Sequence, residues 1–309
     1  DVADNAVVTT LLGLGGNDRI LDDPYTADGS GAVVDMGAYE LAFDSNNIYI
    51  WNGPSSGGVL ENPQNWLPFW KQTTWSNLLF NSIDPMPTQL LDQLAINKLV
   101  VSAGNVEIDL VGSLFQLDAT SNPIVVGGTD QPSTLRFHGG GTVQTAADVT
   151  LFQGEVTFED NIALYAPKII LLDNSYLGFD GVSTSDLINL GGKLEPSGRG
   201  VGEFTLNGDL INMEKRNPTG NLVGSIGFDI QGTSQGVDYD ALIVFGAADM
   251  ACSIDLKWGG DYTASAGDTF DLVVADTSSG SPSLVYSSGL PSNLAIRWAN
   301  PSAFHAGGG

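Results

Sequence analysis

The chain has 309 residues, of which 36 are acidic and 11 are basic, so its formal net charge at pH 7 is −25. Nucleic-acid phosphates and anionic lipid headgroups would repel such a surface, and no basic cluster offsets it, so we expect no nucleic-acid binding and no direct membrane insertion. No apolar run reaches the ~18 residues that a membrane-spanning helix requires. The single cysteine excludes an intrachain disulfide.

Residues 1–44 are acidic and contain many turn-forming residues. The stretch "GLGGNDRILDD" partly matches a glycine-rich calcium-binding turn, but it occurs once, and "DPYTADGSG" lacks the terminal Glu of a calcium hand. Ordinary turns, in which Asp and Asn side chains bond their own backbone, are the alternative. Calcium is therefore the one cofactor that the sequence leaves open. Its candidate ligands are Asp18, Asp22, Asp23 and Asp28.

Residues 45–97 form a Trp-rich entry segment, in which "NWLPFWKQTTW" places Trp66, Trp70 and Trp75 close together. Aromatic rings stack on the apolar faces of sugars, so these three residues are candidates for glycan binding. Burial as a cap over the first strands is the alternative.

The same segment contains the only helix that we expect. In "DPMPTQLLDQLAINK", Thr88 is a candidate N-cap, and Leu90, Leu91 and Leu94 follow at helical spacing. The pattern predicts one short helix that ends near Asn97.

Residues 98–212 consist of short alternating stretches separated by Gly, Asn and Asp, which predicts strands of about 4 to 6 residues. A sandwich of hairpins and a β-solenoid are both compatible with this pattern. Close, irregular turns, and glycine pairs such as Gly191–Gly192 that suit sharp corners, favour a parallel β-helix-like solenoid. The stretches are "KLVVSAGNVEIDL", "SNPIVVGG", "STLRFHGGGTVQT", "DVTLFQGEVTFED", "KIILLDNSYLGFDG", "DLINLGGKLEPSG" and "GEFTLNGDLIN".

Residues 213–309 show clearer period-two alternation, which predicts a β-rich region that continues or caps the solenoid. Cys252 lies in one of the apolar rows, so we expect a core residue rather than a nucleophile. The inward rows that we expect are Ile226, Phe228 and Ile230; Met250, Cys252, Ile254, Leu256 and Trp258; Phe270, Leu272 and Val274; and Leu294, Ile296 and Trp298.

The sequence offers little for catalysis. The two histidines, His138 and His305, lie far apart, and one cysteine cannot build the usual zinc site. A polysaccharide lyase or hydrolase is the enzymatic alternative, although the same charges fit a solvated strand face. Its candidate residues are Arg136 and Lys168 as bases and Glu155, Glu159 and Asp160 as carboxylates. We therefore predict no enzyme activity.

Two stretches resemble parts of known secreted proteins. The segment ending in Asp35, Met36, Gly37, Ala38, Tyr39 and Glu40 resembles the closing segment of right-handed parallel β-helix domains in large bacterial proteins of planctomycete type. This resemblance implies that residues 1–44 close an upstream β-helix module whose body precedes residue 1.

The second resemblance begins at Trp51. "IWNGPSSGGVLENPQNW" is similar to the opening of autotransporter-associated β-strand repeats, through Trp51, Gly53, Asn65 and Trp66. The stretches 239–242 and 267–270 are similar to the last part of such regions. The resemblance implies a secreted, cell-surface protein and names no activity.

Together these patterns predict a non-enzymatic extracellular module: a scaffold, stalk, adhesin-like or self-assembling subunit. Its expected partners are further copies, other surface proteins or polysaccharide. A polysaccharide-binding or polysaccharide-degrading β-helix protein is the alternative.

Overall fold

The computed structural model describes residues 47–68, 74–127, 133–198, 200–213, 224–259, 262–265 and 267–286. The chain divides into two compact units, 1–48 and 49–309. All of the first unit except residues 47 and 48 lies outside the described residues, as do the predicted closing motif and the predicted strand over 294–298. The description below concerns the second unit.

The described residues are all-β, with one 3-10 turn, η2 (Pro63–Asn65), and no α-helix. The strands are β1 (Ile48–Trp51), β2 (Gly58–Val59), β3 (Trp66–Leu67), β4 (Asn77–Phe80), β5 (Met86–Gln89), β6 (Leu94–Ile96), β7 (Lys98–Val101), β8 (Gly104–Asp109), β9 (Leu114–Leu117), β10 (Ile124–Val126), β11 (Ser133–His138), β12 (Thr142–Thr145), β13 (Val149–Leu151), β14 (Gly154–Leu171), β15 (Ser175–Asn189), β16 (Lys193–Glu195), β17 (Glu203–Leu206), β18 (Leu210–Asn212), β19 (Ser225–Ile230), β20 (Ala241–Asp249), β21 (Ser253–Trp258), β22 (Val273–Ser279) and β23 (Ser283–Tyr286). Each of the seven stretches quoted above for residues 98–212 overlaps at least one of these strands, as predicted. The predicted length of about 4 to 6 residues is wrong for β14 and β15, which have 18 and 15 residues.

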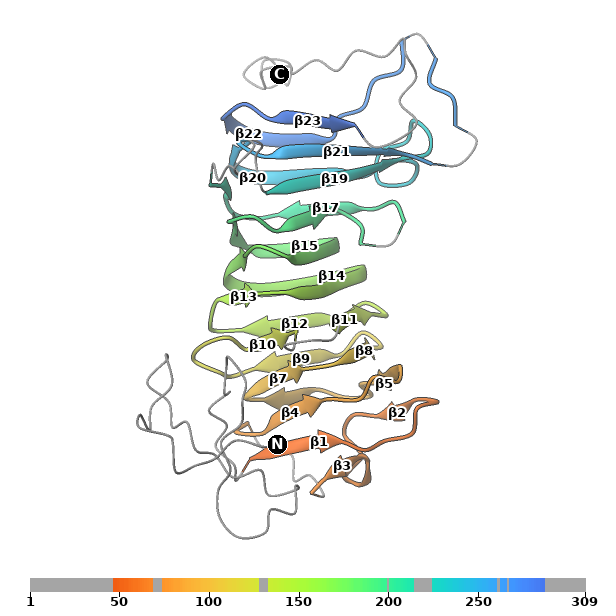
Figure 1. Ribbon diagram of the computed structural model, residues 1–309, viewed down its shortest axis with the longest axis vertical. Coiled ribbons are helices and arrows are strands. Elements are labelled where there is room, and N and C mark those ends of the chain that lie inside the picture. The colour runs from red at the N-terminus through yellow and green to blue at the C-terminus, as the bar shows by residue number, and fades with distance from the viewer. Residues whose placement is uncertain are drawn as a thin grey trace, which may run out of the picture. The chain divides into compact units, whose positions relative to one another are not determined.

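Most strands of the second unit pair in parallel with strands that come later in the chain (Figure 1). We call the strands between one such pairing and the next a set. We call the run β2, β5, β8, β11, β14, β15, β16, β19, β21 and β23 ladder A. Ladder B is the run β6, β9, β12, β14, β15, β17, β20 and β22. Ladder C is the run β13, β14, β15, β18 and β20, and a separate sheet joins β4, β7 and β10 in parallel. The long strands β14 and β15 contribute to all three ladders.

The core lies on the inner side of these ladders because apolar residues alternate along each strand. In β11, Leu135 and Phe137 are fully buried, whereas Arg136 and His138 remain partly exposed. Buried phenylalanines follow one another from strand to strand, with ring centroids 4.4–5.9 Å apart. Two of the four ring pairs, Phe137–Phe158 and Phe179–Phe204, are stacked, and the other two are tilted, all within the range of favourable aromatic contacts. The series is Phe115, Phe137, Phe158, Phe179 and Phe204.

Two tryptophans close the core near β1 and β3. Trp51 and Trp66 lie edge to face at 5.0 Å, and both contact the ring of Phe80. The indole nitrogen of Trp66 donates to the carbonyl of Leu60 at 2.8 Å. β1 pairs with β3 in the antiparallel direction, so the regular parallel pairing does not continue through this pair.

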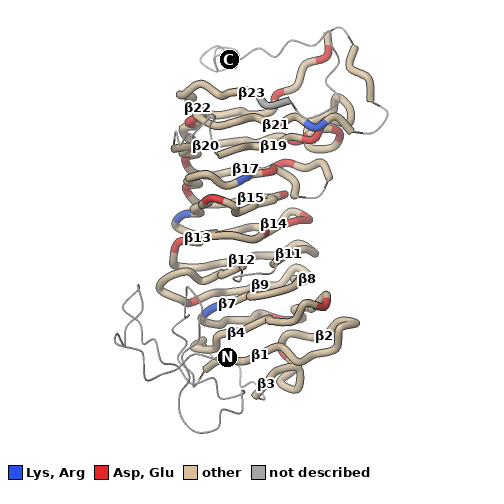
Figure 2. The backbone as a smooth tube through the Cα atoms, viewed as in Figure 1, with Lys and Arg blue, Asp and Glu red and all other residues tan. Residues whose placement is uncertain are grey.

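Several acidic side chains accept backbone hydrogen bonds where strands end or their register is irregular. Asp186 Oδ1 accepts from the amide of Asp209 at 3.1 Å, and Asp209 Oδ1 accepts from the amide of Ala247 at 2.8 Å. Figure 2 shows several acidic segments where strands end and the chain changes direction. Part of the net negative charge therefore satisfies backbone donors between neighbouring sets of strands.

The predicted helix is wrong. The segment forms β5 and β6, and the hydroxyl of Thr88 donates to the carbonyl of Glu107 instead of capping a helix. Leu90 and Leu94 are buried, whereas Leu91 is 57 % exposed. Pairing of β5 with β8 and of β6 with β9 overrides the helical preference of the leucines.

The C-terminal rows are confirmed in part. Ile226, Phe228 and Ile230 are buried, and Cys252 is fully buried within its predicted apolar row, where burial raises the pKa of its thiol to about 12. In the row Phe270, Leu272 and Val274, the first two residues pack against the core, whereas Val274 is wrong: Leu242 pairs with Val273, and Val274 is therefore 44 % exposed. Parallel pairing also crosses two of the three predicted segment boundaries, since β4 pairs with β7 across residues 97 and 98, and β16 pairs with β19 across residues 212 and 213.

Candidate functional site

The outer face of ladder A carries polar and charged side chains from successive strands. Gln89 of β5, Asp109 of β8 and His138 of β11 occupy one row across the strands. Glu107 and Arg136 occupy the next row. Because the pairing is parallel and in register, residues far apart in sequence lie side by side on this face.

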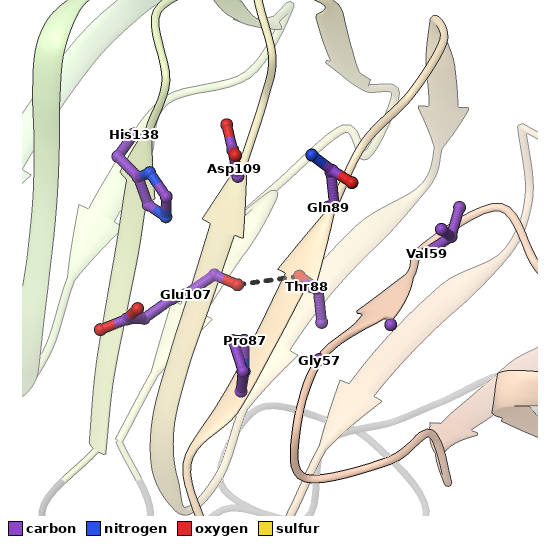
Figure 3. Close-up of a pocket in the computed structure, with 9 residues that line it drawn as sticks. Gly57, Val59, Pro87, Thr88, Gln89, Glu107, Asp109 and His138 are labelled. Atoms are coloured by element: carbon purple, nitrogen blue, oxygen red, sulfur yellow. Dashed lines mark hydrogen bonds between the residues drawn. The ribbon is translucent and has the colours of Figure 1, made fainter.

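A shallow depression of about 420 Å³ lies over the first strands of ladder A (Figure 3). Gly57 and Gly58 form one wall without side chains, while Val59 and Pro87 add apolar surface. Its polar lining comes from Thr88, Gln89, Glu107, Asp109 and His138.

Figure 3 shows the side chains of Gln89, Asp109 and His138 along neighbouring strands. Asp109 Oδ1 accepts a hydrogen bond from the amide of Val111 at 3.1 Å, which fixes this carboxylate to its own turn. The imidazole of His138 has no hydrogen-bond partner within the described part of the chain. The depression thus offers an imidazole, an amide and carboxylates as hydrogen-bonding groups.

Arg136 is held by two carboxylates. Its Nε and Nη2 donate to Glu159 Oε2 at 2.8 and 2.5 Å, and Nη1 lies 3.6 Å from Glu107 Oε2. The hydrogen bond with Glu159 is the main cause that raises the pKa of Arg136, and burial opposes it. Glu159 is 8 % exposed, so its charge depends on this guanidinium for compensation.

A second charged cluster surrounds Glu195 farther along the same face. Glu195 Oε1 contacts the ammonium groups of Lys193 at 2.6 Å and of Lys257, while Oε2 accepts from the hydroxyl of Tyr176 at 2.5 Å. Burial raises the pKa of Glu195, but these three partners outweigh it, so the net shift is downward. The two lysines therefore neutralise a carboxylate that is 6 % exposed.

The segment around Gly198 covers the centre of this face. The carbonyl of Gly198 lies 2.9 Å from the Tyr176 hydroxyl, and Gly198 lies so close to Gly178 that a Cβ there would overlap it. Glycine at position 178 allows this approach of two backbones. Direct access to the strands at Thr157, which is 1 % exposed, is thereby closed.

Asp240 anchors the two chain segments that border this cover. Its Oδ1 accepts from the amide of Gly202 at 2.9 Å, and its Oδ2 accepts from the amide of Asp229 at 2.7 Å. The residue is 1 % exposed, and burial raises the pKa of its carboxyl to about 6 although the amide hydrogen bonds oppose that shift.

The candidate catalytic residues do not converge on one open site. Arg136 belongs to ladder A, whereas Lys168 pairs with Asp186 on ladder C. Glu155 and Glu159 lie on the same strand, but Glu159 is bonded to Arg136, and Asp160 Oδ2 accepts from the amide of Gly139 at 3.0 Å. A base must be able to take a proton from a substrate, and a guanidinium held by two carboxylates is poorly suited to that role.

The three tryptophans do not form one exposed platform. Trp66 is fully buried in the core, which corrects its assignment as a glycan-binding residue, because a buried indole cannot stack on a sugar. Trp75 is 71 % exposed, and Trp70 lies outside the described residues.

The candidate calcium ligands Asp18, Asp22, Asp23 and Asp28 also lie outside the described residues. Within the described ranges, no group of three or more His, Cys, Asp or Glu side chains is arranged to hold a metal ion. In the same ranges, no helix is long and apolar enough to cross a membrane.

Sequence reasoning missed the Glu195 cluster and Asp240. The segments "KLEPS" and "SIDLKW" each alternate polar and apolar residues, which places Lys193, Glu195 and Lys257 outward, but only the strand register brings them together. The sequence around Asp240 gave no such signal. Its burial is compensated by the amides of Gly202 and Asp229, which are distant in sequence.

No protein-family model matches this chain, and neither a curated protein nor a solved structure shows significant similarity to it.

Proposed function

We propose that the chain is a β-solenoid that serves as a non-enzymatic, extracellular structural module, a rigid spacer or scaffold at a cell surface. The observation that carries this proposal is the parallel pairing that links strands from β2 to β23. In such an architecture each set of strands is hydrogen-bonded to and packed against the sets on either side, so the whole stack is rigid. The extracellular placement rests on the resemblance of residues 35–40 and 51–66 to secreted bacterial proteins.

The charges of ladder A support a structural role. The Arg136–Glu159 pair and the Glu195 cluster each connect different strands and leave their cations bonded to carboxylates of the same chain. Groups used in this way hold neighbouring strands in register and are not available for substrate chemistry.

Incubation with a panel of neutral and acidic polysaccharides tests the non-enzymatic part of this proposal. We expect neither new reducing ends nor unsaturated products. Turnover that persists through purification and disappears in Arg136→Ala would overturn it. Antibody labelling of intact, unpermeabilised source cells tests the placement, and labelling only after permeabilisation would contradict it.

Polysaccharide binding at the depression over β2, β5, β8 and β11 is a second candidate function. The observation in its favour is the row formed by Gln89, Asp109 and His138, next to the apolar surface of Pro87. Sugar hydroxyls need both donors and acceptors, and apolar sugar faces need an apolar contact. The carboxylates of Glu107 and Asp109 favour a neutral saccharide over an acidic one.

Calorimetric titration with neutral and uronic-acid oligosaccharides tests this candidate. We expect binding of a neutral oligosaccharide that His138→Ala weakens about tenfold, as loss of a hydrogen bond costs roughly 1.4 kcal/mol. Gln144→Ala, a change at an exposed position of ladder B, is the matched control. Equal affinity of both variants, or no binding at all, would remove this function.

A further inference from the structure

The outer face of ladder B carries an uncharged strip, defined by two rows of residues that cross its strands. All members of the first row are partly or clearly exposed, and none is charged. Its members, each paired with the next, are Leu114, Thr142, Ala163, Val182, Thr205, Ile243 and Val274. The second row is Gln116, Gln144, Tyr165 and Thr184, which are also uncharged.

Several of the larger apolar side chains of the strip face solvent. Val182 is 42 % exposed, Val274 44 % and Tyr165 47 %. Phe245, which follows Ile243 at the alternating position of β20, is 59 % exposed. These apolar side chains lie on β14, β15, β20 and β22 of the same ladder, with Thr205 of β17 between them. Grouped exposed apolar residues, unlike single ones, mark interaction sites.

The absence of charge from the strip stands out against the composition of the chain, which carries 36 acidic residues. Acidic side chains border it: Glu203 precedes Thr205 by two positions on β17, and Asp276 follows Val274 by two positions on β22. Two copies of a chain with net charge −25 repel each other over most of their surface, and the strip is a region where they can approach without juxtaposing carboxylates.

The side chains of the strip repeat at the spacing of the strands, and a second copy of the chain has the same spacing. Its first row crosses seven strands, which at about 4.8 Å per strand extends over about 29 Å. Sheet faces pack through interdigitated side chains, so the best partner presents side chains with the same strand spacing. Another copy of ladder B meets this condition along its whole length.

We propose that the uncharged strip of ladder B is a lateral contact between two copies of this chain. The proposal rests on the proposed structural function and names the partner and the surface through which the module assembles. With a length of about 29 Å and two residue rows about 7 Å apart, the strip covers on the order of 200–400 Å², which is below the roughly 800 Å² per partner of a stable complex. The contact is therefore weak and depends on protein concentration, and it gains strength where many copies are held side by side.

Sedimentation velocity over a concentration series, at low and at high salt, tests this contact. We expect the sedimentation coefficient to rise with concentration, and to rise more at high salt, because salt screens the repulsion between acidic copies. Val182→Glu places a charge in the centre of the strip and is expected to weaken association at least tenfold.

Ile211→Glu is the matched control, because Ile211 is 37 % exposed on β18 of ladder C, outside the strip. It adds the same charge at an exposed apolar strand position and is expected to leave association unchanged. Thermal melting of both variants establishes that each is folded. A wild-type chain that is monomeric at all concentrations, or equal effects of the two variants, would overturn the contact and leave the spacer role untouched.

Discussion

The rings of Phe137 and Phe158 are stacked, with centroids 5.2 Å apart and an angle of 8° between their planes. They belong to neighbouring strands of ladder A, and both are buried to within 1 %. The contact links two sets of strands through the core, in addition to their backbone hydrogen bonds.

Phe158→Ala tests the importance of this aromatic series. We expect it to lower the free energy of unfolding by about 3–5 kcal/mol, because it removes a buried ring and leaves a cavity between two further phenylalanines. Urea denaturation measures the change. Phe245→Ala, at a 59 % exposed position, is the control and should change stability by less than about 1 kcal/mol. Equal losses would contradict the role of the stack.

Arg136→Met tests the ion pair with Glu159. Oε1 of Glu159 is buried without a hydrogen-bond partner among the described residues, so loss of Arg136 leaves the carboxylate with little compensation. We expect a loss of about 1–3 kcal/mol in chemical denaturation. The double variant Arg136→Met, Glu159→Leu should recover most of it, because the buried carboxylate that Arg136 compensates is then also removed. Additive losses would show that the two residues do not act as a pair.

Asp240 predicts a specific pH dependence of stability. Burial raises the pKa of its carboxyl to about 6 in the folded chain, above the ordinary value of 3.8. The folded chain therefore binds this proton more tightly than the unfolded chain, and the resulting stability is present below about pH 4 and lost as the pH rises through 6. The contribution is at most about 3 kcal/mol.

Asp240→Asn isolates that contribution from those of other acids. We expect the difference in unfolding free energy between wild type and variant to grow as the pH falls from 7 to 4, measured by urea denaturation at each pH. A constant difference would show that Asp240 titrates normally. We also expect the variant to be less stable than the wild type. Asp240 accepts hydrogen bonds from the amides of Gly202 and Asp229, and the side-chain NH₂ of the asparagine would place a donor against one of these two donors.

Gly104 and Gly112 provide a matched pair for testing the corners. Their φ angles are +79° and +78°, so alanine costs about the same backbone strain at both, on the order of 1 kcal/mol. A Cβ at position 104 would also overlap the carbonyl of Ser82, whereas nothing lies within 4 Å of one at position 112. Gly104→Ala should therefore lower the melting temperature more than Gly112→Ala. Equal decreases in melting temperature would show that backbone strain alone, and not the overlap with Ser82, causes the loss of stability.

Alternation and turn residues predicted the class of fold well. Rows such as Ile226, Phe228 and Ile230 needed only local information, because a strand with one buried face repeats every two residues. The pattern also assigned Cys252 correctly to the core.

The predicted helix failed for a physical reason. Met86, Thr88 and Leu90 alternate inward, as do Leu94 and Ile96, but two adjacent leucines also match a helical spacing. Only pairing with β8 and β9 decides between the two, and that pairing joins residues about 20 positions apart. Val274 failed similarly, since its orientation depends on the register with β20.

The candidate site could be predicted only in part. Arg136 and Glu159 were recognisable as charged residues, but their bond joins strands separated by 23 positions. The depression combines side chains from four strands, and Trp66 was assigned to binding because a tryptophan inside the core and one on the surface have the same local sequence signal.

The parallel register between β14 and β15 pairs Gly154 with Ser175 and Leu171 with Asn189, so the two strands are offset by about twenty residues. In the solenoid that we propose, such a unit of about twenty residues forms one layer. Each layer contacts mainly the layers on either side of it, and the layer thickness is set by the distance between hydrogen-bonded strands, about 4.8 Å. For the proposed spacer, duplication or deletion of one layer would therefore change its length in fixed steps of that size, while the remaining layers keep their own neighbours.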